Sequence, residues 1–139
     1  CISSVAAVYS IPFQAYYSAS KAAINSFVDA LTNEVKAFGI EVVSVMPGDI
    51  STGFTAARSK TNAGDDVYSG VIGLAVSAME KDEKNGMTPD SVARLVVKVA
   101  EKRHISPLYT AGFQYKALVF LSRIFPHKLA VKIVGGLYK

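Results

Sequence analysis

The alternation of apolar and polar positions divides the first part of the chain into a strand, a helix and a second strand. Residues 1–4 have the composition of the last residues of a buried strand. Over 15–38, alanines and larger apolar residues recur at steps of three and four, which is the period of an amphipathic helix. Gly39 is placed to end that helix as a left-handed cap. The β-branched run 40–46 then has the length of a buried strand, which Pro47-Gly48 stops.

Turn-forming stretches and helical periods alternate over the rest of the chain. In order, the pattern predicts a mobile loop over 53–65, a helix over about 66–81, a turn at 84–86, a helix over about 88–103, a strand within 106–112 and one or two helices over 113–138. The helix after the turn has the clearest start signal. Thr88 is suited to be its N-cap, and the proline that follows fits its first turn.

A buried strand, a long helix and a second buried strand in succession indicate a parallel sheet, because parallel neighbours need a crossover that is usually a helix. The predicted fold class is therefore α/β, with helices covering a parallel sheet. We assign residues 1–112 to this unit. Residues 113–139 are assigned to a helical extension in which basic and apolar residues mix.

The composition agrees with one globular domain and excludes several classes of protein. Of 139 residues, 50% are hydrophobic and 19% are charged, which is typical of a chain with its own core. The single cysteine excludes an internal disulfide, and neither histidine has Cys, Asp or Glu at metal-ligand spacing, so no metal site is assigned. The sequence has no recognisable signal peptide and no apolar run near the roughly 18–20 residues that span a bilayer. We expect a cytoplasmic protein, with peripheral membrane contact as an alternative.

The basic charge is concentrated in the tail. The formal net charge is +4, yet residues 102–139 contain 7 Lys and Arg and no Asp or Glu. If 128–139 is helical, Lys128, Lys132 and Lys139 fall within about 40° of one another, and apolar residues fill the remaining arc. Such a helix either closes a substrate pocket or an oligomer contact, with solvated lysines, or lies in a membrane interface. No aromatic-interleaved basic patch accompanies these charges, so nucleic acid is not expected as a partner.

The stretch YYSASK carries the first candidate chemistry. Tyr17 and Lys21 are four residues apart, so on a helix their side chains lie about 40° apart on one face, whereas Tyr16 points elsewhere. A free tyrosine has a pKa of about 10, and a neighbouring ammonium favours the phenolate, which suits general acid–base catalysis. Ser3 or Ser4 can supply a hydroxyl that binds a substrate oxygen. A Tyr-x-x-x-Lys pair is common by chance on helices, so its context decides its meaning.

That context resembles the short-chain dehydrogenase/reductase family. Ser4 stands thirteen residues before Tyr17, the text Tyr-Ser-Ala-Ser-Lys-Ala-Ala follows, and the next strand ends in Pro-Gly-Asp-Ile-Ser-Thr at 47–52. Members of the family have a serine at the same interval before the tyrosine, which selects Ser4 over Ser3. The motifs stand in the family's order over residues 1 to about 55. The resemblance implies a Rossmann-type doubly wound parallel sheet, of which this chain would supply the C-terminal half.

The resemblance also implies roles for individual residues. Tyr17 would be the general acid/base that exchanges a proton with the reacting oxygen, and Lys21 would favour its phenolate and bind the nicotinamide ribose. Ser4 would polarise and orient the reacting oxygen. Tyr17 and Lys21 would bind the cofactor together with four residues beside the nicotinamide: Pro47, Gly48, Ile50 and Thr52. The cofactor would be NAD or NADP, with NADP slightly favoured.

Several parts of the family's site have no counterpart in this sequence. It has no Gly-rich turn for the cofactor pyrophosphate, no Asn-Ala-Gly segment and no residue that chooses between NAD and NADP. In the family all of these lie upstream of the serine strand. We therefore expect the missing N-terminal half of the same protein as a partner, and we expect the isolated chain to be unstable and inactive. A homo-oligomer is also expected, because the helix over 15–38 usually packs in a subunit interface in this family.

The predicted function is that of an NAD(P)-dependent oxidoreductase that interconverts a carbonyl compound and an alcohol by hydride transfer. Residues 53–87 occupy the family's substrate-lid position, where Arg58 and Lys60 are the only candidates for reading a substrate charge. A hydrophobic or lipid-like substrate is favoured by the apolar residues of this segment, which are Phe54, Val67, Tyr68, Val71, Ile72, Leu74 and Met79. Two rival interpretations are a truncated, non-catalytic family member that acts by association, and a membrane-contact module built around the tail.

Overall fold

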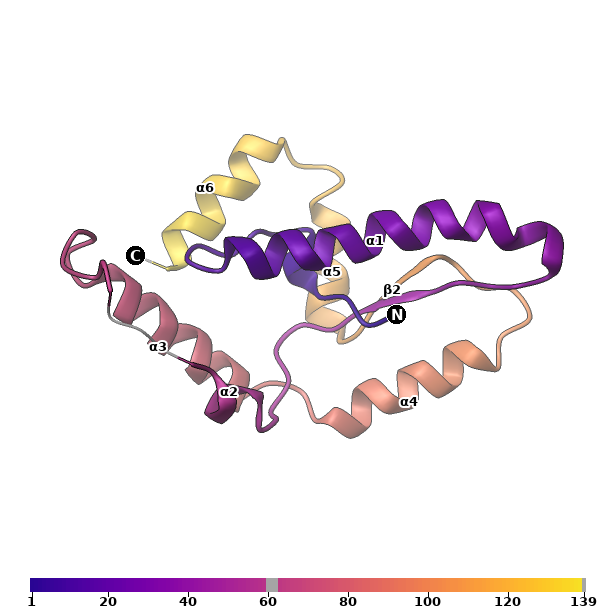
Figure 1. The fold of residues 1–139 in the computed structure, drawn as a ribbon, viewed down its shortest axis with the longest axis horizontal. Helices are drawn as coiled ribbons and strands as arrows, with labels where there is room; N and C mark the ends of the chain where they lie inside the picture. The colour runs from indigo at the N-terminus through magenta and orange to yellow at the C-terminus, as the bar shows by residue number, and fades with distance from the viewer. Residues whose placement is uncertain (60–62, 139) are drawn as a thin grey trace.

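The structure, a computed structural model, describes residues 1–59 and 63–138 as a small parallel sheet surrounded by helices (Figure 1). The elements are, in order, the 3-10 turn η1 (Val5–Ala7), α1 (Ala15–Val35), the 3-10 turn η2 (Lys36–Phe38), β1 (Ser44–Met46), α2 (Phe54–Ala57), α3 (Val71–Lys84), α4 (Pro89–Ala100), β2 (Leu108–Thr110), α5 (Phe113–Leu121) and α6 (His127–Leu137). This order confirms the predicted α/β class.

The sheet is parallel in every pairing that the described residues make. β1 pairs with β2 in the register Val45 opposite Tyr109. On the other side of β1 the N-terminal segment forms a bridge between Ile2 and Val45. Backbone hydrogen bonds extend this pairing, because the Ser3 N–H donates to the Val45 carbonyl at 2.8 Å. The predicted strand over 1–4 is therefore present as an extended segment that pairs along β1.

Helices cover both faces of this sheet, as expected for a doubly wound fold. Successive residues of a strand point to opposite faces. On one face Met46 packs with Val5 and with Val119 of α5, and Ser44 donates a hydrogen bond to the Asn25 side chain of α1 at 2.9 Å. On the other face Val45 packs with Val92 of α4. In Figure 1, α1 and α4 accordingly lie on opposite sides of the strands.

Several predicted boundaries are confirmed by the local geometry. α1 begins at Ala15, and the 3-10 turn after it ends at Gly39, whose φ of 68° is the predicted left-handed cap. The Thr88 side chain accepts a hydrogen bond from the Ser91 N–H, so Thr88 is the N-cap of α4 as expected. The tail forms two helices, α5 and α6. The division of the chain at residue 112 stays a prediction, and Lys139 lies outside the described residues.

Other predicted boundaries were wrong. The helix expected over 66–81 begins at Val71, because Gly70 adopts a φ of 80° and the Asp65 carboxylate accepts a hydrogen bond from the Ile72 N–H at 3.0 Å. The same oxygen also accepts from the Gly73 N–H, so the Asp65 side chain caps the helix start. The loop expected over 53–65 contains the short helix α2, and its residues 60–62 lie outside the described part.

Two elements are shorter than predicted. The strand expected over 40–46 is assigned only at Ser44–Met46, the stretch that pairs with β2. α4 ends at Ala100 rather than near residue 103, so the basic residues after it follow the last turn. Within residues 1–59 and 63–138, no helix has both the length and the apolar character needed to cross a bilayer.

Gly86 allows the backbone around Asp49 to pass close to it. A Cβ at residue 86 would lie 2.5 Å from the Asp49 carbonyl carbon and 2.8 Å from the Ile50 nitrogen, which are backbone atoms that cannot rotate away. At Gly53 a Cβ would meet nothing within 4 Å. We predict that Gly86→Ala in the full-length protein lowers the free energy of unfolding by about 1–3 kcal/mol, and that Gly53→Ala changes it by less than about 0.5 kcal/mol.

Urea denaturation of both variants measures these differences. Equal stabilities of Gly86→Ala and Gly53→Ala would contradict the close approach at residue 86.

Candidate active site

A cavity of about 580 Å³ opens at the carboxyl edge of the sheet, where the N-terminal segment and β1 end. Parallel strands bring the residues that follow them to one edge, which is where ligands bind in open α/β sheets. The structure brings together all seven residues that the sequence singled out, and these line the cavity wall: Ser4, Tyr17, Lys21, Pro47, Gly48, Ile50 and Thr52.

The first turns of α1 place Tyr17 and Lys21 on one face. The Lys21 ammonium lies 5.6 Å from the centre of the Tyr17 ring and donates a hydrogen bond to the Ile2 carbonyl at 3.0 Å. Among the described residues, the Tyr17 hydroxyl has no hydrogen-bond partner. Tyr16 is 95% exposed and points away from the cavity. The i, i+4 spacing therefore separates the two tyrosines as expected.

The two serines at the end of the N-terminal segment have different partners. The Ser3 hydroxyl donates to the Lys21 carbonyl at 2.8 Å, so its proton is already used to hold α1. The Ser4 oxygen accepts a hydrogen bond from the Ala6 N–H at 3.1 Å and caps η1. Within the described part of the chain the Ser4 proton has no acceptor, so it can be donated to a bound oxygen. This geometry favours Ser4 over Ser3 as the hydroxyl that meets a substrate.

The segment from Pro47 to Thr52 is fixed by backbone hydrogen bonds on both sides. The Val5 N–H donates to the Pro47 carbonyl at 2.9 Å, and the Met87 N–H donates to the Asp49 carbonyl at 2.9 Å. Next, the Thr52 hydroxyl oxygen accepts from the Phe54 N–H at 3.2 Å. These bonds hold the Pro-Gly segment rigidly between the N-terminal segment and the turn before α4.

The sequence did not point to Tyr115, which comes from α5 and reaches the same wall. Its hydroxyl donates to the Asp49 carboxylate at 2.7 Å and accepts from the Asp49 N–H at 3.1 Å. Its ring covers Gly48, where a Cβ would lie 2.1 Å from the ring. Burial and the Asp49 carboxylate raise the pKa of Tyr115 above its ordinary value, so its hydroxyl stays protonated and donates near neutral pH. Tyr115 lies far along the chain from this segment, so the sequence contained only one sign of a close neighbour there, which is the glycine at residue 48.

The tail contributes apolar side chains to the cavity wall. The lining residues of α5, α6 and the link between them are Leu118, Leu121, Phe125, Ala130, Ile133, Val134, Leu137 and Tyr138. Of the apolar lid residues picked out from the sequence, Phe54 and Met79 line the cavity. Tyr68 instead packs edge to face on Phe13, with ring centres 5.7 Å apart. The tail thus forms a helix pair that lines the cavity, and its predicted contacts with an oligomer partner or a membrane stay predictions.

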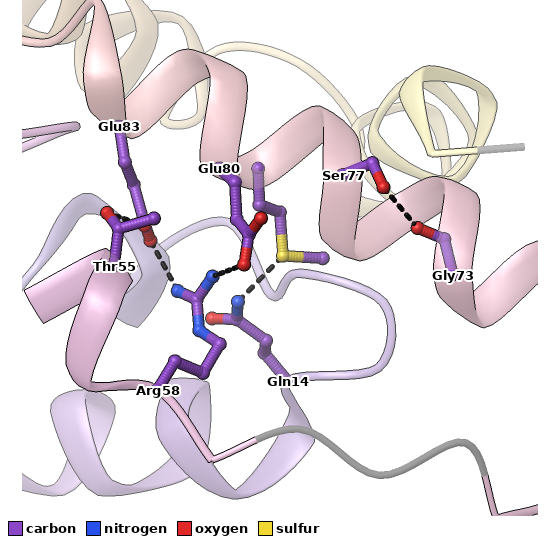
Figure 2. Close-up of polar contacts among 8 residues, drawn as sticks. Gln14, Thr55, Arg58, Gly73, Ser77, Glu80 and Glu83 are labelled. Atoms are coloured by element: carbon purple, nitrogen blue, oxygen red, sulfur yellow. Dashed lines mark hydrogen bonds and ion pairs between the residues drawn. The ribbon is translucent and has the colours of Figure 1, made fainter.

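A cluster of polar side chains connects α2 and the residue after it to α3 (Figure 2). The Arg58 guanidinium pairs with the Glu83 carboxylate and lies 3.9 Å from Glu80. The Thr55 hydroxyl donates to Glu83 at 2.6 Å, so α2 is fastened to α3. Arg58 is therefore occupied by glutamates and is not available to read a substrate charge. Lys60, the other candidate, lies outside the described residues.

Comparison with known proteins agrees with this geometry. The family described as short chain dehydrogenase matches residues 1–63. A 3-ketodihydrosphingosine reductase of Bacteroides thetaiotaomicron is 36% identical over 105 residues, which cover 74% of this chain and 39% of that protein. Dehydrogenase/reductase SDR family member 7B of Xenopus laevis is 35% identical over 125 residues, or 90% of this chain and 35% of that protein.

A third relative is the NADPH-dependent 3-dehydrocapnine reductase of Ornithobacterium rhinotracheale, which is 32% identical over 127 residues, or 86% of this chain and 44% of that protein. The chain thus spans less than half the length of these curated relatives. The family match covers the serine, the Tyr-x-x-x-Lys pair and the Pro-Gly segment, which are the parts that meet at the cavity. The chain belongs to the short-chain dehydrogenase/reductase family.

Proposed function

We propose that the protein containing this chain is an NAD(P)-dependent oxidoreductase that interconverts a carbonyl compound and an alcohol by hydride transfer. The observation that carries the proposal is the meeting of Ser4, Tyr17 and Lys21 on the wall of one cavity, beside the Pro-Gly segment. An association module has no need for these three side chains to converge on a cavity. Family membership supports the same class of reaction.

Each reacting side chain has one task in this proposal. In the reducing direction the Tyr17 hydroxyl donates its proton to the carbonyl oxygen as the alcohol forms. The Lys21 ammonium, 5.6 Å from the Tyr17 ring centre, favours the phenolate that remains. The Ser4 proton donates a hydrogen bond to the same oxygen and stabilises its developing negative charge. In the oxidising direction the proton moves back from the alcohol to Tyr17.

The cavity residues fit the nicotinamide and ribose part of a dinucleotide. Lys21 and Tyr17 offer a cation and a hydroxyl suited to ribose hydroxyls, and Thr52 offers a hydroxyl suited to a carboxamide. Pro47, Gly48 and Ile50 would lie against the ring. When bound, the cofactor supplies or accepts the hydride. The NADPH dependence in the name of the Ornithobacterium rhinotracheale relative supports NADP over NAD for this protein.

The apolar wall supports a hydrophobic or lipid-like substrate. The tail helices and the link between them present leucine, isoleucine, valine and phenylalanine side chains to the cavity that Tyr17 also lines. Burying apolar groups there would contribute about 25 cal/mol for each Å² removed from water. Relatives that are named as reductases of 3-ketodihydrosphingosine and 3-dehydrocapnine support the same substrate class.

The exposed side of the N-terminal segment supports the presence of a covering partner. Ile2 and Phe27 are large apolar residues that are about half exposed, and they line a second hollow together with Cys1, Ala23 and Ile24. Among the described residues, no strand pairs with the N-terminal segment on the side away from β1. We propose that the N-terminal half of the same protein adds its strand and cofactor cradle there.

Tyr17→Phe tests the catalytic role with Tyr16→Phe as the matched control. We predict that Tyr17→Phe in the full-length protein lowers kcat for carbonyl reduction by about 10²–10⁴-fold, because the ring stays and only the proton donor is lost. Tyr16→Phe should leave kcat unchanged, since Tyr16 is 95% exposed and outside the cavity. NAD(P)H oxidation measures kcat, and cofactor fluorescence measures whether binding persists. Retention of most activity by Tyr17→Phe would overturn the mechanism and favour the association-module interpretation.

Chain-length dependence tests the apolar wall. We predict that kcat/KM for a series of methyl ketones rises about fourfold for each added methylene, as expected from about 0.8 kcal/mol per buried CH₂, until the cavity is filled. Ile133→Asn should flatten this rise, because Ile133 lines the cavity. Val131→Asn is the control, since Val131 lies on the same helix and is exposed to a similar extent but does not line the cavity. A flat series for the unmodified protein would argue against an apolar substrate.

A further inference from the structure

Asp49 is a carboxylate on the wall of an otherwise mainly apolar cavity. It follows the Pro-Gly segment directly and lines the same cavity as Ser4 and Tyr17. Its carboxylate accepts one side-chain hydrogen bond, from the Tyr115 hydroxyl to Oδ2 at 2.7 Å. Within residues 1–59 and 63–138, Oδ1 has no donor, and neither oxygen forms an ion pair with a Lys or Arg. A carboxylate in such surroundings is stabilised by any cation that the cavity admits.

The other charges of the cavity wall are already engaged. The Lys21 ammonium is turned to the Ile2 carbonyl and the Tyr17 ring. The Glu83 carboxylate is paired with Arg58 and accepts the Thr55 hydroxyl. Asp49 is thus the carboxylate of the described wall whose charge is not matched by a guanidinium or ammonium of the chain.

Tyr115 holds Asp49 in place without neutralising it. The phenol donates to Oδ2 and accepts from the Asp49 N–H at 3.1 Å, so one side chain fixes both the backbone and the carboxylate of residue 49. Its pKa is raised, so it remains a neutral donor near neutral pH. The pKa of Tyr138, which also lines the cavity, is raised by burial and then by the charges of Asp49, Asp82 and Glu83.

We propose that Asp49 is a specificity-determining residue that binds a cationic amine carried by the substrate, while the apolar chain of that substrate lies along α5 and α6. The inference rests on the proposed function, because the carbonyl group that is reduced belongs to the same substrate as the amine. An alkylammonium has three N–H donors and a positive charge. Oδ1 of Asp49 can accept a charge-assisted hydrogen bond from one of these N–H groups. An apolar wall with one fixed carboxylate thus selects an amphiphile with a positive head rather than a neutral one.

The test compares the binding of octylamine and octanol to the full-length protein. Octylamine is protonated near neutral pH, as a lysine side chain is, and octanol has a chain of the same length without the charge. Isothermal titration calorimetry gives Kd for both. We expect octylamine to bind about 10–100-fold more tightly than octanol, a difference of about 1.4–2.8 kcal/mol. The same protein is then assayed for reduction of a long-chain aminoketone and of the matched ketone without the amine.

Asp49→Asn removes the charge and keeps an oxygen that can accept the Tyr115 hydroxyl. We expect it to abolish the preference for octylamine while Kd for octanol stays within about twofold. Asp66→Asn is the matched control, because Asp66 is exposed and does not line the cavity. It should leave both constants unchanged.

The outcomes separate this inference from the proposed function. Equal binding of octylamine and octanol by the unmodified protein would overturn the role of Asp49, even if both ketones are reduced. A parallel loss of octanol and octylamine binding in Asp49→Asn would also overturn it, because that pattern marks a purely structural residue. An amine preference that depends on Asp49, without reduction of either ketone, would support the amine site and overturn the reductase function.

Discussion

The parallel pairing of the N-terminal segment with β1 is the constraint on which the candidate site depends. The Ser3 N–H donates to the Val45 carbonyl at 2.8 Å, and the Val5 N–H donates to the Pro47 carbonyl at 2.9 Å. Because the two segments run in the same direction, Ser4 and the Pro-Gly turn leave the sheet at the same edge. A shift of the pairing by one residue would turn Ser4 to the opposite face of the sheet and separate it from Tyr17.

The same segment also positions the helix that carries the tyrosine and lysine. The Ser3 hydroxyl donates to the Lys21 carbonyl at 2.8 Å, and the Lys21 ammonium donates to the Ile2 carbonyl at 3.0 Å. In the first contact the N-terminal segment donates to α1, and in the second α1 donates to the N-terminal segment. Both contacts involve Lys21, one helical turn after Tyr17. Ser4, Tyr17 and Lys21 are therefore supported by regular elements and their hydrogen bonds, which keep side chains at fixed separations.

The cavity has two chemically different sides, and each comes from a different part of the chain. The edge of the sheet and the start of α1 supply hydroxyls, an ammonium and backbone polar groups, whereas α5 and α6 supply aliphatic and aromatic side chains. Tyr115 joins the two sides, because it belongs to α5 but binds Asp49 at the edge of the sheet. A substrate with a polar reacting end and an apolar chain matches this division.

Features that depend on residues close together in the chain could be predicted from the sequence. The i, i+4 relation of Tyr17 and Lys21, the cap at Gly39 and the start of α4 at Thr88 depend on neighbours within a few residues, so local geometry was sufficient. The predicted start of α3 was wrong, because the Asp65 side chain caps this helix and Asp65 is not one of the regularly spaced apolar residues. A helix start that is set by such a side-chain hydrogen bond cannot be predicted from the spacing of apolar residues alone.

The sequence by itself therefore determined the α/β class, the parallel order of the elements and the residue types able to exchange a proton with a carbonyl oxygen. Only the tertiary structure decided which of Ser3 and Ser4 has a free proton, that the tail lines the cavity, and that Tyr115 holds Asp49. The physical reason is the distance along the chain. Contacts such as that between residues 49 and 115 form when helices pack on the sheet, and hydrophobic packing is non-directional, so no local pattern specifies its partners.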